Sequence, residues 1–486
     1  MTAGTERTYF GLERVDWVSV RVFAALVLLG WLNIYAAVAA DGAEAFSLSS
    51  KYGSQLVWIG ISLAAAIVIL LVDDIYYHVF AYPVYWIMLA LLVFTLFLSP
   101  EINGARSWLR VGPVSFQPAE FMKFAAALAL ARCMSAYNFS MRSGKGMLTV
   151  ALILLLPMGI IALQNDMGSA VVYVSFLLVL YREGMNGWVL FALVLAAAVF
   201  VLAMLLSKAA LVALIFLFFV LLEGFMNGDW KRKAVYVAAV ALAALTVFYL
   251  LNLAFGPGAV DMYWCLAGAV ALSLGAAAVY GYRRRLRSVF LCMALMAGSL
   301  VYAASVDYAF DKLLQVHQQK RVLDLLGIES DLQKWGYNVN QSMIAIGSGG
   351  FSGKGFLKGT QTKYDFVPEQ HTDFIFCTVG EEWGFLGSAA VLGLFGLLII
   401  RLMRMGERQK EPFGRVYCYG VAGVFLFHLA VNVGMTVGIV PVIGIPLPLF
   451  SYGGSSLLAF TAMFFVAVKL EAKKRGPLLD GADQPL

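Results

Sequence analysis

Uninterrupted apolar runs recur along this chain of 486 residues, and each is long enough to cross a bilayer. A helix needs roughly 17–25 predominantly apolar residues to span the hydrocarbon core. Because of these runs, 61% of all residues are hydrophobic and only 13% are charged, and the mean hydropathy of the chain is +0.82. Soluble domains are about 45–50% apolar and about 25% charged. The chain is therefore expected to lie in a membrane, and a soluble protein of two or three domains is excluded.

About fourteen runs can be placed as spanning helices, which predicts an all-α polytopic membrane protein. The polar start, Met1 to Asp16, and the length of the first run favour a retained helix over a cleaved signal peptide. The run at 168–181 is the shortest. The predicted spans are 17–40, 55–72, 79–98, 118–134, 147–163, 168–181, 187–206, 209–226, 234–255, 262–282, 288–307, 374–400, 414–439 and 455–470.

The positive charges predict which side of the membrane each connection faces. Most of the 35 lysines and arginines sit in short clusters between the runs, and cytoplasmic connections are enriched in these residues. With a cytoplasmic amino terminus every strongly basic cluster falls on one side. Both termini are therefore expected in the cytoplasm, with 99–117 and 308–373 outside. The same distribution argues against a nucleic-acid partner, despite a formal net charge of +6.

Glu120 and Lys123 form the most informative pair of charged residues. They are three positions apart in the helix that Pro118 opens, near the outer end of that helix. Ionisable residues inside a membrane are costly, which makes them candidates for a functional site. The alternative is a mutually satisfied pair that only fixes helix packing.

For the other acidic residues expected on the outer side, an ordinary structural role explains their positions as well as a functional role does. Asp166 lies in the short turn QNDMG, and Asp373 and Glu381–Glu382 flank the start of the next helix. Asp is a common turn residue, and carboxylates are favoured near helix N-termini. Asp331, two residues after Glu329, precedes the helical stretch NVNQSMIAIG and by itself is a solvated loop acid.

Two glycine- or proline-rich segments complete the outer side. GSGGFSGKG is not a phosphate-binding loop, because Ser348 and Gly355 stand where that motif needs a glycine and a hydroxyl residue. IVPVIGIPLPLFSYGGSS, at 439–456, is expected to be a non-helical, re-entrant connection. Such backbone is tolerated at membrane depth where it is buried in protein or lines a wet cavity.

Five stretches in one order resemble the SEDS family (shape, elongation, division and sporulation). The match covers roughly 10–206 and 308–475, and the form PVIGIPLP is similar to the family's rod-shape branch rather than its division branch. The stretches are NGARSWLRVGPVSFQPAEFMK (103–123), QNDMGSA (164–170), QSMIAIGSGGFSGKGFLKGTQ (341–361), QHTDFIFCTVGEEWGFLG (370–387) and PVIGIPLPLFSYGGSS (441–456).

The resemblance implies a peptidoglycan glycosyltransferase in the bacterial cytoplasmic membrane. It would polymerise lipid II into glycan strands at the outer face, during elongation and cell-shape maintenance. Asp331 matches the family's essential loop aspartate, and Glu120 and Lys123 match its buried salt bridge. Other polar residues in or beside the stretches are expected to bind substrate or to shape a polar cavity: Arg106, Asp166, Lys363, His371, Asp373 and Ser451.

The implied partners are lipid II, a class B penicillin-binding protein transpeptidase, other proteins of the elongation complex and membrane lipids. No cofactor is assigned, with a divalent cation, Mg²⁺ or Mn²⁺, as the one candidate. Two other functions stay open on the residues alone. One is a transporter that flips lipid II, which an embedded Glu120–Lys123 pair would suit, and the other is a membrane scaffold.

The chain departs from the family's usual ten spans by an apparent insertion of four helices at 208–307. An even number of added spans keeps the later loop outside. The expected organisation is a cytoplasmic tail (1–16), the first part of the core (17–207), the inserted helices (208–307), a large catalytic loop (308–373), the last part of the core (374–470) and a cytoplasmic tail (471–486).

Overall fold

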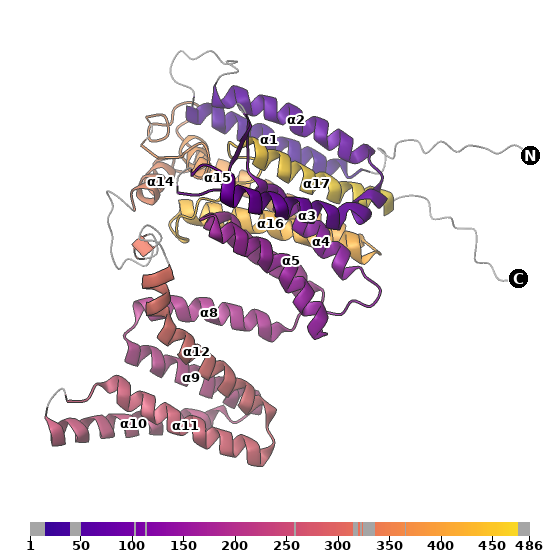
Figure 1. Cartoon of the computed structure of the whole chain (residues 1–486). Helices are drawn as coiled ribbons and strands as arrows, with labels where there is room; N and C mark the ends of the chain where they lie inside the picture. The colour runs from indigo at the N-terminus through magenta and orange to yellow at the C-terminus, as the bar shows by residue number, and fades with distance from the viewer. Residues whose placement is uncertain are drawn as a thin grey trace, which may run out of the picture. The chain divides into compact units, whose positions relative to one another are not determined.

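The computed structural model describes residues 15–38, 50–101, 104–111, 114–256, 259–313, 319–320, 323, 336–364 and 366–474. Most of these residues are helical (Figure 1). They divide into two compact units. Unit 1 comprises the chain up to Met185 and from Asp331 onward, and unit 2 comprises Asn186–Ser330.

Unit 1 is built from long helices with conventional caps. Ser50 and Ser143 accept hydrogen bonds from the backbone N–H of Gly53 and Gly146, and Pro118 and Pro412 open two further helices. Its elements are α1 (Trp17–Val38), α2 (Lys51–Leu71), α3 (Asp74–Leu98), β1 (Leu109–Val111), β2 (Val114–Phe116), α4 (Pro118–Met134), α5 (Gly144–Leu163), α6 (Met167–Val171), η2 (Val172–Phe176), α7 (Leu177–Arg182), α14 (Tyr337–Ser348), α15 (Ile375–Arg408), α16 (Pro412–Thr436) and α17 (Gly454–Lys474).

Helix α4 lies at the centre of unit 1. It packs against α3, α16 and α17, and nearly all of its residues are buried. Six of its positions are alanine, at 119, 125, 126, 127, 129 and 131. Small residues let helix backbones approach closely, which is how helices associate where lipid removes the hydrophobic driving force. The position of α4 therefore places Glu120 and Lys123 among other helices and away from lipid.

Two irregular segments lie next to α4. The antiparallel hairpin β1–β2, with Arg110 paired to Ser115, leads directly into the helix. Between α16 and α17 the chain is non-helical over 437–453, a segment called the proline loop below. Its apolar residues Ile445, Leu447 and Phe450 are buried. The expected non-helical connection is therefore present and is packed inside the protein, where such backbone is tolerated. Its re-entrant path through the membrane stays a prediction.

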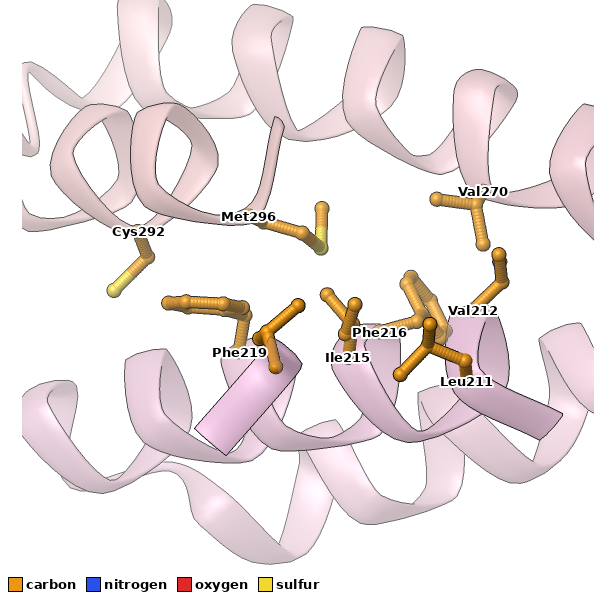
Figure 2. Packing of buried hydrophobic residues seen from close by; sticks show 9 residues of the cluster. Leu211, Val212, Ile215, Phe216, Phe219, Val270, Cys292 and Met296 are labelled. Carbon is orange, nitrogen blue, oxygen red and sulfur yellow. The ribbon is translucent and has the colours of Figure 1, made fainter. Parts of the chain in front are cut away.

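Up to Leu313, the described part of unit 2 is a bundle of these helices: α8 (Gly187–Leu205), α9 (Lys208–Asn227), α10 (Trp230–Phe255), α11 (Met262–Arg284) and α12 (Arg287–Leu313). Gly228 ends α9 in the left-handed region, with φ of 76°, which suits a residue without a Cβ atom. Figure 2 shows the core, where residues of α9 meet residues of α11 and α12. The labelled core residues are Leu211, Val212, Ile215, Phe216, Phe219, Val270, Cys292 and Met296.

The all-helical membrane fold was predicted, but the count of fourteen spans is not confirmed. Within the described part of the chain, 12 helices are long and apolar enough to cross a membrane. The two remaining predicted spans are present as shorter helical segments. One is α4, with 17 residues, and the other is Met167–Arg182, which η2 interrupts as a 3₁₀ turn.

The compact units and the predicted insertion have different limits. Unit 2 begins at Asn186, so α8 groups with the inserted helices rather than with the core. The physical reason is packing, because α8 contacts α12 and α9. Residues 208–307 remain our expectation for the insertion itself.

Candidate functional site

The ion pair of α4 is fully enclosed. Lys123 Nζ donates to Glu120 Oε1 at 2.8 Å, and the two side chains are 0% and 3% exposed. The ammonium group also lies 5.2 Å from the centroid of the Phe460 ring of α17. Taking two charges out of water is costly unless the pair is well oriented and further hydrogen bonds satisfy it. The pair predicted from the i, i+3 spacing therefore exists, and it needs additional partners.

His428 of α16 supplies the main additional partner. Its Nε2 lies 3.0 Å from Lys123 Nζ, and its Nδ1 lies 3.0 Å from the carbonyl oxygen of Pro446. A lysine ammonium group can only donate and a carbonyl can only accept. The contacts therefore require a neutral imidazole that accepts at Nε2 and carries its proton on Nδ1. We call Glu120, Lys123, His428 and the Pro446 carbonyl the lysine network.

The proline loop is held at two further points. Asn432 Nδ2 of α16 donates to Ile445 O at 2.7 Å and to Asp373 O at 2.8 Å. Ser451 Oγ donates to Thr372 O at 2.6 Å and accepts from Leu447 N–H at 2.8 Å. These bonds tie the loop to the segment that precedes α15, so that Asp373 and Ser451 are near each other.

Asp166 lies close enough to the lysine network for the charge of Glu120 to act on it. Its carboxylate caps α6 by accepting from Ser169 N–H at 3.0 Å, and Gln117 Nε2 donates to it at 2.8 Å. Burial raises the pKa of Asp166, and the negative charge of Glu120 raises it further, although these hydrogen bonds act in the opposite direction. Gly168 lies so close to the proline loop that a Cβ atom there would be 2.6 Å from Ile443 O.

A second buried carboxylate organises the loop after α14. Glu381, with its side chain 0% exposed, accepts from Lys354 Nζ at 2.6 Å and from Thr360 N–H at 2.7 Å. It also accepts from the N–H groups of Gln361 and Thr362, both at 2.9 Å. We call residues 353–362 the glutamate loop. Its backbone is folded around one side chain of α15.

A break in α15 makes this arrangement possible. Gly384 has φ of 62° and ψ of −156°, a conformation available almost only to glycine. The break frees backbone groups for the preceding loop, so Lys354 N–H donates to Glu381 O at 3.0 Å and Phe385 N–H donates to Gly350 O at 3.0 Å. The glutamate loop and the break in α15 are thus one hydrogen-bonded structure.

The other predicted site residues are only partly brought together. Asp331 and Glu329 lie outside the described residues. The side chain of Arg106 is exposed, and its guanidinium lies 3.6 Å from the carboxylate of Glu101. The backbone N–H of Arg106 donates to Gln164 O at 3.0 Å. Lys363 is near Glu382 at the glutamate loop. His371 Nε2 lies 2.9 Å from Lys51 Nζ, at the surface.

The exposed cations are those available to a bound phosphate group. Lys123 and Lys354 already neutralise Glu120 and Glu381. Arg106, Arg110 and Lys358 are exposed. In the part of the chain that the structure describes, no group of three or more His, Cys, Asp or Glu could hold a metal ion. A divalent cation therefore stays a proposal.

Sequence reasoning missed His428 and Asn432 and gave Glu381 too small a role. A histidine in an apolar helix is usually a core residue, and its partner Lys123 is 305 positions away in the sequence. The four-residue spacing of His428 and Asn432, which puts two polar side chains on one helix face, was the available signal.

The chain is similar to proteins of known family along most of its length. The family model FtsW/RodA/SpoVE, described as cell cycle protein, matches residues 16–244 and 232–476. Peptidoglycan glycosyltransferase RodA of Treponema pallidum is 33% identical over 469 residues, which cover 96% of this chain and 99% of that protein. Peptidoglycan glycosyltransferase MrdB of Escherichia coli K12 is 28% identical, with 97% of each chain covered.

Solved structures show the same fold. A chain from the study "Structural coordination of polymerization and crosslinking by a peptidoglycan synthase complex" matches with a TM-score of 0.60 and 25% identity, over 95% of this chain and 99% of that one. Rod shape determining protein RodA of Thermus thermophilus matches with a TM-score of 0.54 and 24% identity, over 95% of this chain and 98% of that one. The second likeness concerns the fold alone.

Proposed function

This chain belongs to the FtsW/RodA/SpoVE family of cell cycle proteins, and from that membership we propose that it polymerises lipid II for the growing cell wall. It is a peptidoglycan glycosyltransferase of the RodA type, a multi-pass membrane enzyme of cell elongation. The observation that carries this conclusion is the 33% identity to the Treponema pallidum enzyme over 96% of the chain. The substrate lipid II and the site residues are our proposals.

The proposed reaction joins the 4-hydroxyl of an acceptor sugar to the anomeric carbon of a diphosphate-linked donor. An alcohol is a weak nucleophile and needs a base within hydrogen-bond reach of its proton. Asp331, in the outer loop, is the proposed base. One displacement converts an α-linked donor into a β(1→4) product, so no covalent carboxylate intermediate is needed.

The departing diphosphate needs positive charge near its developing negative charge. The described structure favours Arg110 and Lys358 for this role, because both are exposed, whereas Lys123 and Lys354 are bound to buried carboxylates. Arg106 is a further candidate, because its 3.6 Å pair with Glu101 is exposed to water. A hydrogen bond from the backbone N–H of Arg106 to Gln164 O holds the hairpin that carries Arg110 against the core. The lysine network, in turn, supports the proline loop from inside.

A class B penicillin-binding protein transpeptidase is the proposed partner. The support is the solved chain at 25% identity, whose study concerns a complex that coordinates polymerisation and crosslinking. Polymer length and rate should therefore rise when such a partner is co-reconstituted. No change with any class B protein would contradict the partner assignment and leave the polymerase activity untouched.

The test of the function is polymerisation of lipid II by the purified full-length chain in vesicles. Substrate is supplied on the leaflet that the outer loops face, so transport is not needed. Polymer visible on a gel is expected. A flippase would make none, and would instead move labelled lipid II from one leaflet to the other.

A further inference from the structure

A cavity of about 200 Å³ lies inside unit 2, among α9, α10, α11 and α12. Most of its lining is apolar, including Phe216, Phe219, Cys292 and Met296, and Figure 2 shows these side chains between α9 and α12. Tyr236 and Tyr280 also line it and are 39% and 45% exposed, so the cavity wall reaches the surface of the unit. None of these residues takes part in the proposed polymerisation reaction.

One end of the cavity is polar and its charges are already paired. Lys233 Nζ lies 2.6 Å from Glu223 Oε2, and Asn227 Nδ2 donates to Glu223 Oε1 at 2.7 Å. Both carboxylate oxygens are therefore satisfied. Lys233 also lies 5.5 Å from the centroid of the Tyr280 ring. This closed pair marks the boundary between the apolar cavity and the helix ends.

Six exposed basic residues surround that boundary, and we call them the basic rim: Lys231, Arg232, Arg283, Arg284, Arg285 and Arg287. Ser288 Oγ donates to Asn227 Oδ1 at 3.1 Å, which places the α9–α10 and α11–α12 turns at the same end of the bundle. No residue of the basic rim forms an ion pair with any described residue. Within the described part of the chain, the rim is thus a concentration of positive charge that no carboxylate pairs with.

Exposed aromatic residues at the same end indicate its depth in the membrane. Trp230 and Tyr282 are 52% and 79% exposed, beside Tyr236 and Tyr280. Trp and Tyr are enriched where the hydrocarbon core meets the headgroups, and basic clusters mark the cytoplasmic side. Basic pockets between transmembrane helices on that side bind anionic lipid headgroups.

We propose that this end of unit 2 binds one anionic phospholipid, with its phosphate on the basic rim and part of an acyl chain in the cavity. The combination favours a lipid over a soluble anion, because a soluble anion would leave the apolar cavity unused. It favours an anionic over a zwitterionic phospholipid, because the choline cation of a zwitterionic headgroup would be repelled by the six clustered positive charges, whereas an anionic headgroup carries net negative charge. The site is independent of the proposed polymerase function.

The test is native mass spectrometry of the full chain, exchanged into mild detergent with defined phospholipids. The wild type is expected to retain one phosphatidylglycerol or cardiolipin molecule in preference to phosphatidylcholine. Arg283→Gln/Arg284→Gln/Arg285→Gln/Arg287→Gln should lose affinity at least tenfold, since each basic residue near the surface contributes roughly fivefold. Ala277→Phe, which fills the cavity and leaves the rim intact, should also reduce retention.

A control variant in unit 1 tests whether the loss of lipid is specific to the basic rim. Arg142→Gln/Lys145→Gln removes two exposed basic residues of unit 1 and should leave retention unchanged. Melting temperature checks that each variant is folded, and Ala277→Phe carries the test if the fourfold variant is not. Equal retention of phosphatidylcholine, full retention by folded Ala277→Phe, or displacement by a polyprenyl phosphate or a polypeptide at equal concentration would overturn the proposal.

Discussion

Lys123 is a lysine without access to water, so the protein must satisfy its ammonium group. Glu120 provides the opposite charge, and His428 accepts a second hydrogen bond. His428 can do so only as the neutral tautomer whose other nitrogen donates to Pro446 O. At the scale of residues, one buried charge therefore determines the state of a histidine and fixes the backbone of the proline loop.

The ion pair should show strong coupling between its two residues. Removing one partner of a buried pair typically costs about 3–5 kcal/mol, because the other charge is left uncompensated. Glu120→Ala and Lys123→Ala should each lower the melting temperature and folded yield more than the double variant does. Thermal unfolding in detergent measures this, and strictly additive effects across the double-mutant cycle would refute direct pairing.

His428 should tolerate an amide far better than a hydrocarbon. Glutamine can accept from Lys123 and donate to Pro446 O, whereas phenylalanine leaves both groups unsatisfied at about 1–3 kcal/mol each. We expect His428→Phe to be strongly destabilised and His428→Gln to keep most of the stability and the polymerisation rate. Equal melting temperatures for the two variants would show that these hydrogen bonds contribute nothing.

The sequence was sufficient for Glu120 and Lys123 because three-residue spacing brings side chains together on any helix. It was not sufficient for His428, which meets Lys123 only after α4 and α16 pack. The same limit applies to Glu381. Its place in an early turn of α15 suggested an interaction with the helix dipole, but its partners come from the glutamate loop, folded around it by long-range contacts.

Helix α15 shows how an element can be built around a defect. The break at Gly384 exposes backbone groups that the segment 350–355 then uses. The spans themselves were predictable because bilayer thickness sets their length. The break was not, because Gly384 is one of several glycines in a long apolar helix and only its φ and ψ distinguish it.

Gly384→Ala should therefore destabilise the protein in two ways, through backbone strain and through a steric clash of the added Cβ atom. The Gly384 backbone region is essentially forbidden to other residues, at about 1–3 kcal/mol, and a Cβ atom there would lie 2.3 Å from Gly353 N. We expect a clear loss of melting temperature and of polymerase activity. Gly393→Ala, in the same helix with nothing within 4 Å of its Cβ position, is the control.

If Gly393→Ala proved as harmful as Gly384→Ala, the break would not be the cause. If neither had an effect, the glutamate loop would not depend on the conformation of α15. Hydrogen exchange at 353–362 adds a local readout, because exchange there should accelerate in Gly384→Ala alone.

The whole molecule consists of two compact units with different surfaces and, on our proposals, different ligands. Unit 1 carries the lysine network, the proline loop and the glutamate loop, while unit 2 carries the basic rim. The motifs of unit 1 allowed a prediction of both fold and reaction from sequence. The charge distribution predicted that the two basic turns of unit 2 face the same side, and a hydrogen bond between them agrees. Nothing in the sequence indicated the cavity beside them, because that cavity exists only once the helices pack.

For the whole molecule, the charge distribution predicts which side of the membrane each connection faces. By the charge distribution, Arg142 should be cytoplasmic and Tyr364, which is 69% exposed in the segment between α14 and α15, should face outward. Single cysteines at these positions, in a chain whose five native cysteines are replaced, should react with an impermeant maleimide from opposite sides of the membrane. Labelling of both from one side would contradict the predicted topology.

The most direct test of the account is the polymerisation rate of Asp331→Asn beside Glu329→Gln. Asparagine keeps the shape of aspartate but cannot take up a proton at neutral pH. Loss of a general base typically costs about 10²–10⁴-fold in rate. We predict a loss of that size in Asp331→Asn, with normal expression and melting temperature, and a much milder effect in Glu329→Gln. Near wild-type polymerisation by Asp331→Asn, with Glu329→Gln inactive, would contradict the assignment of Asp331 as the base.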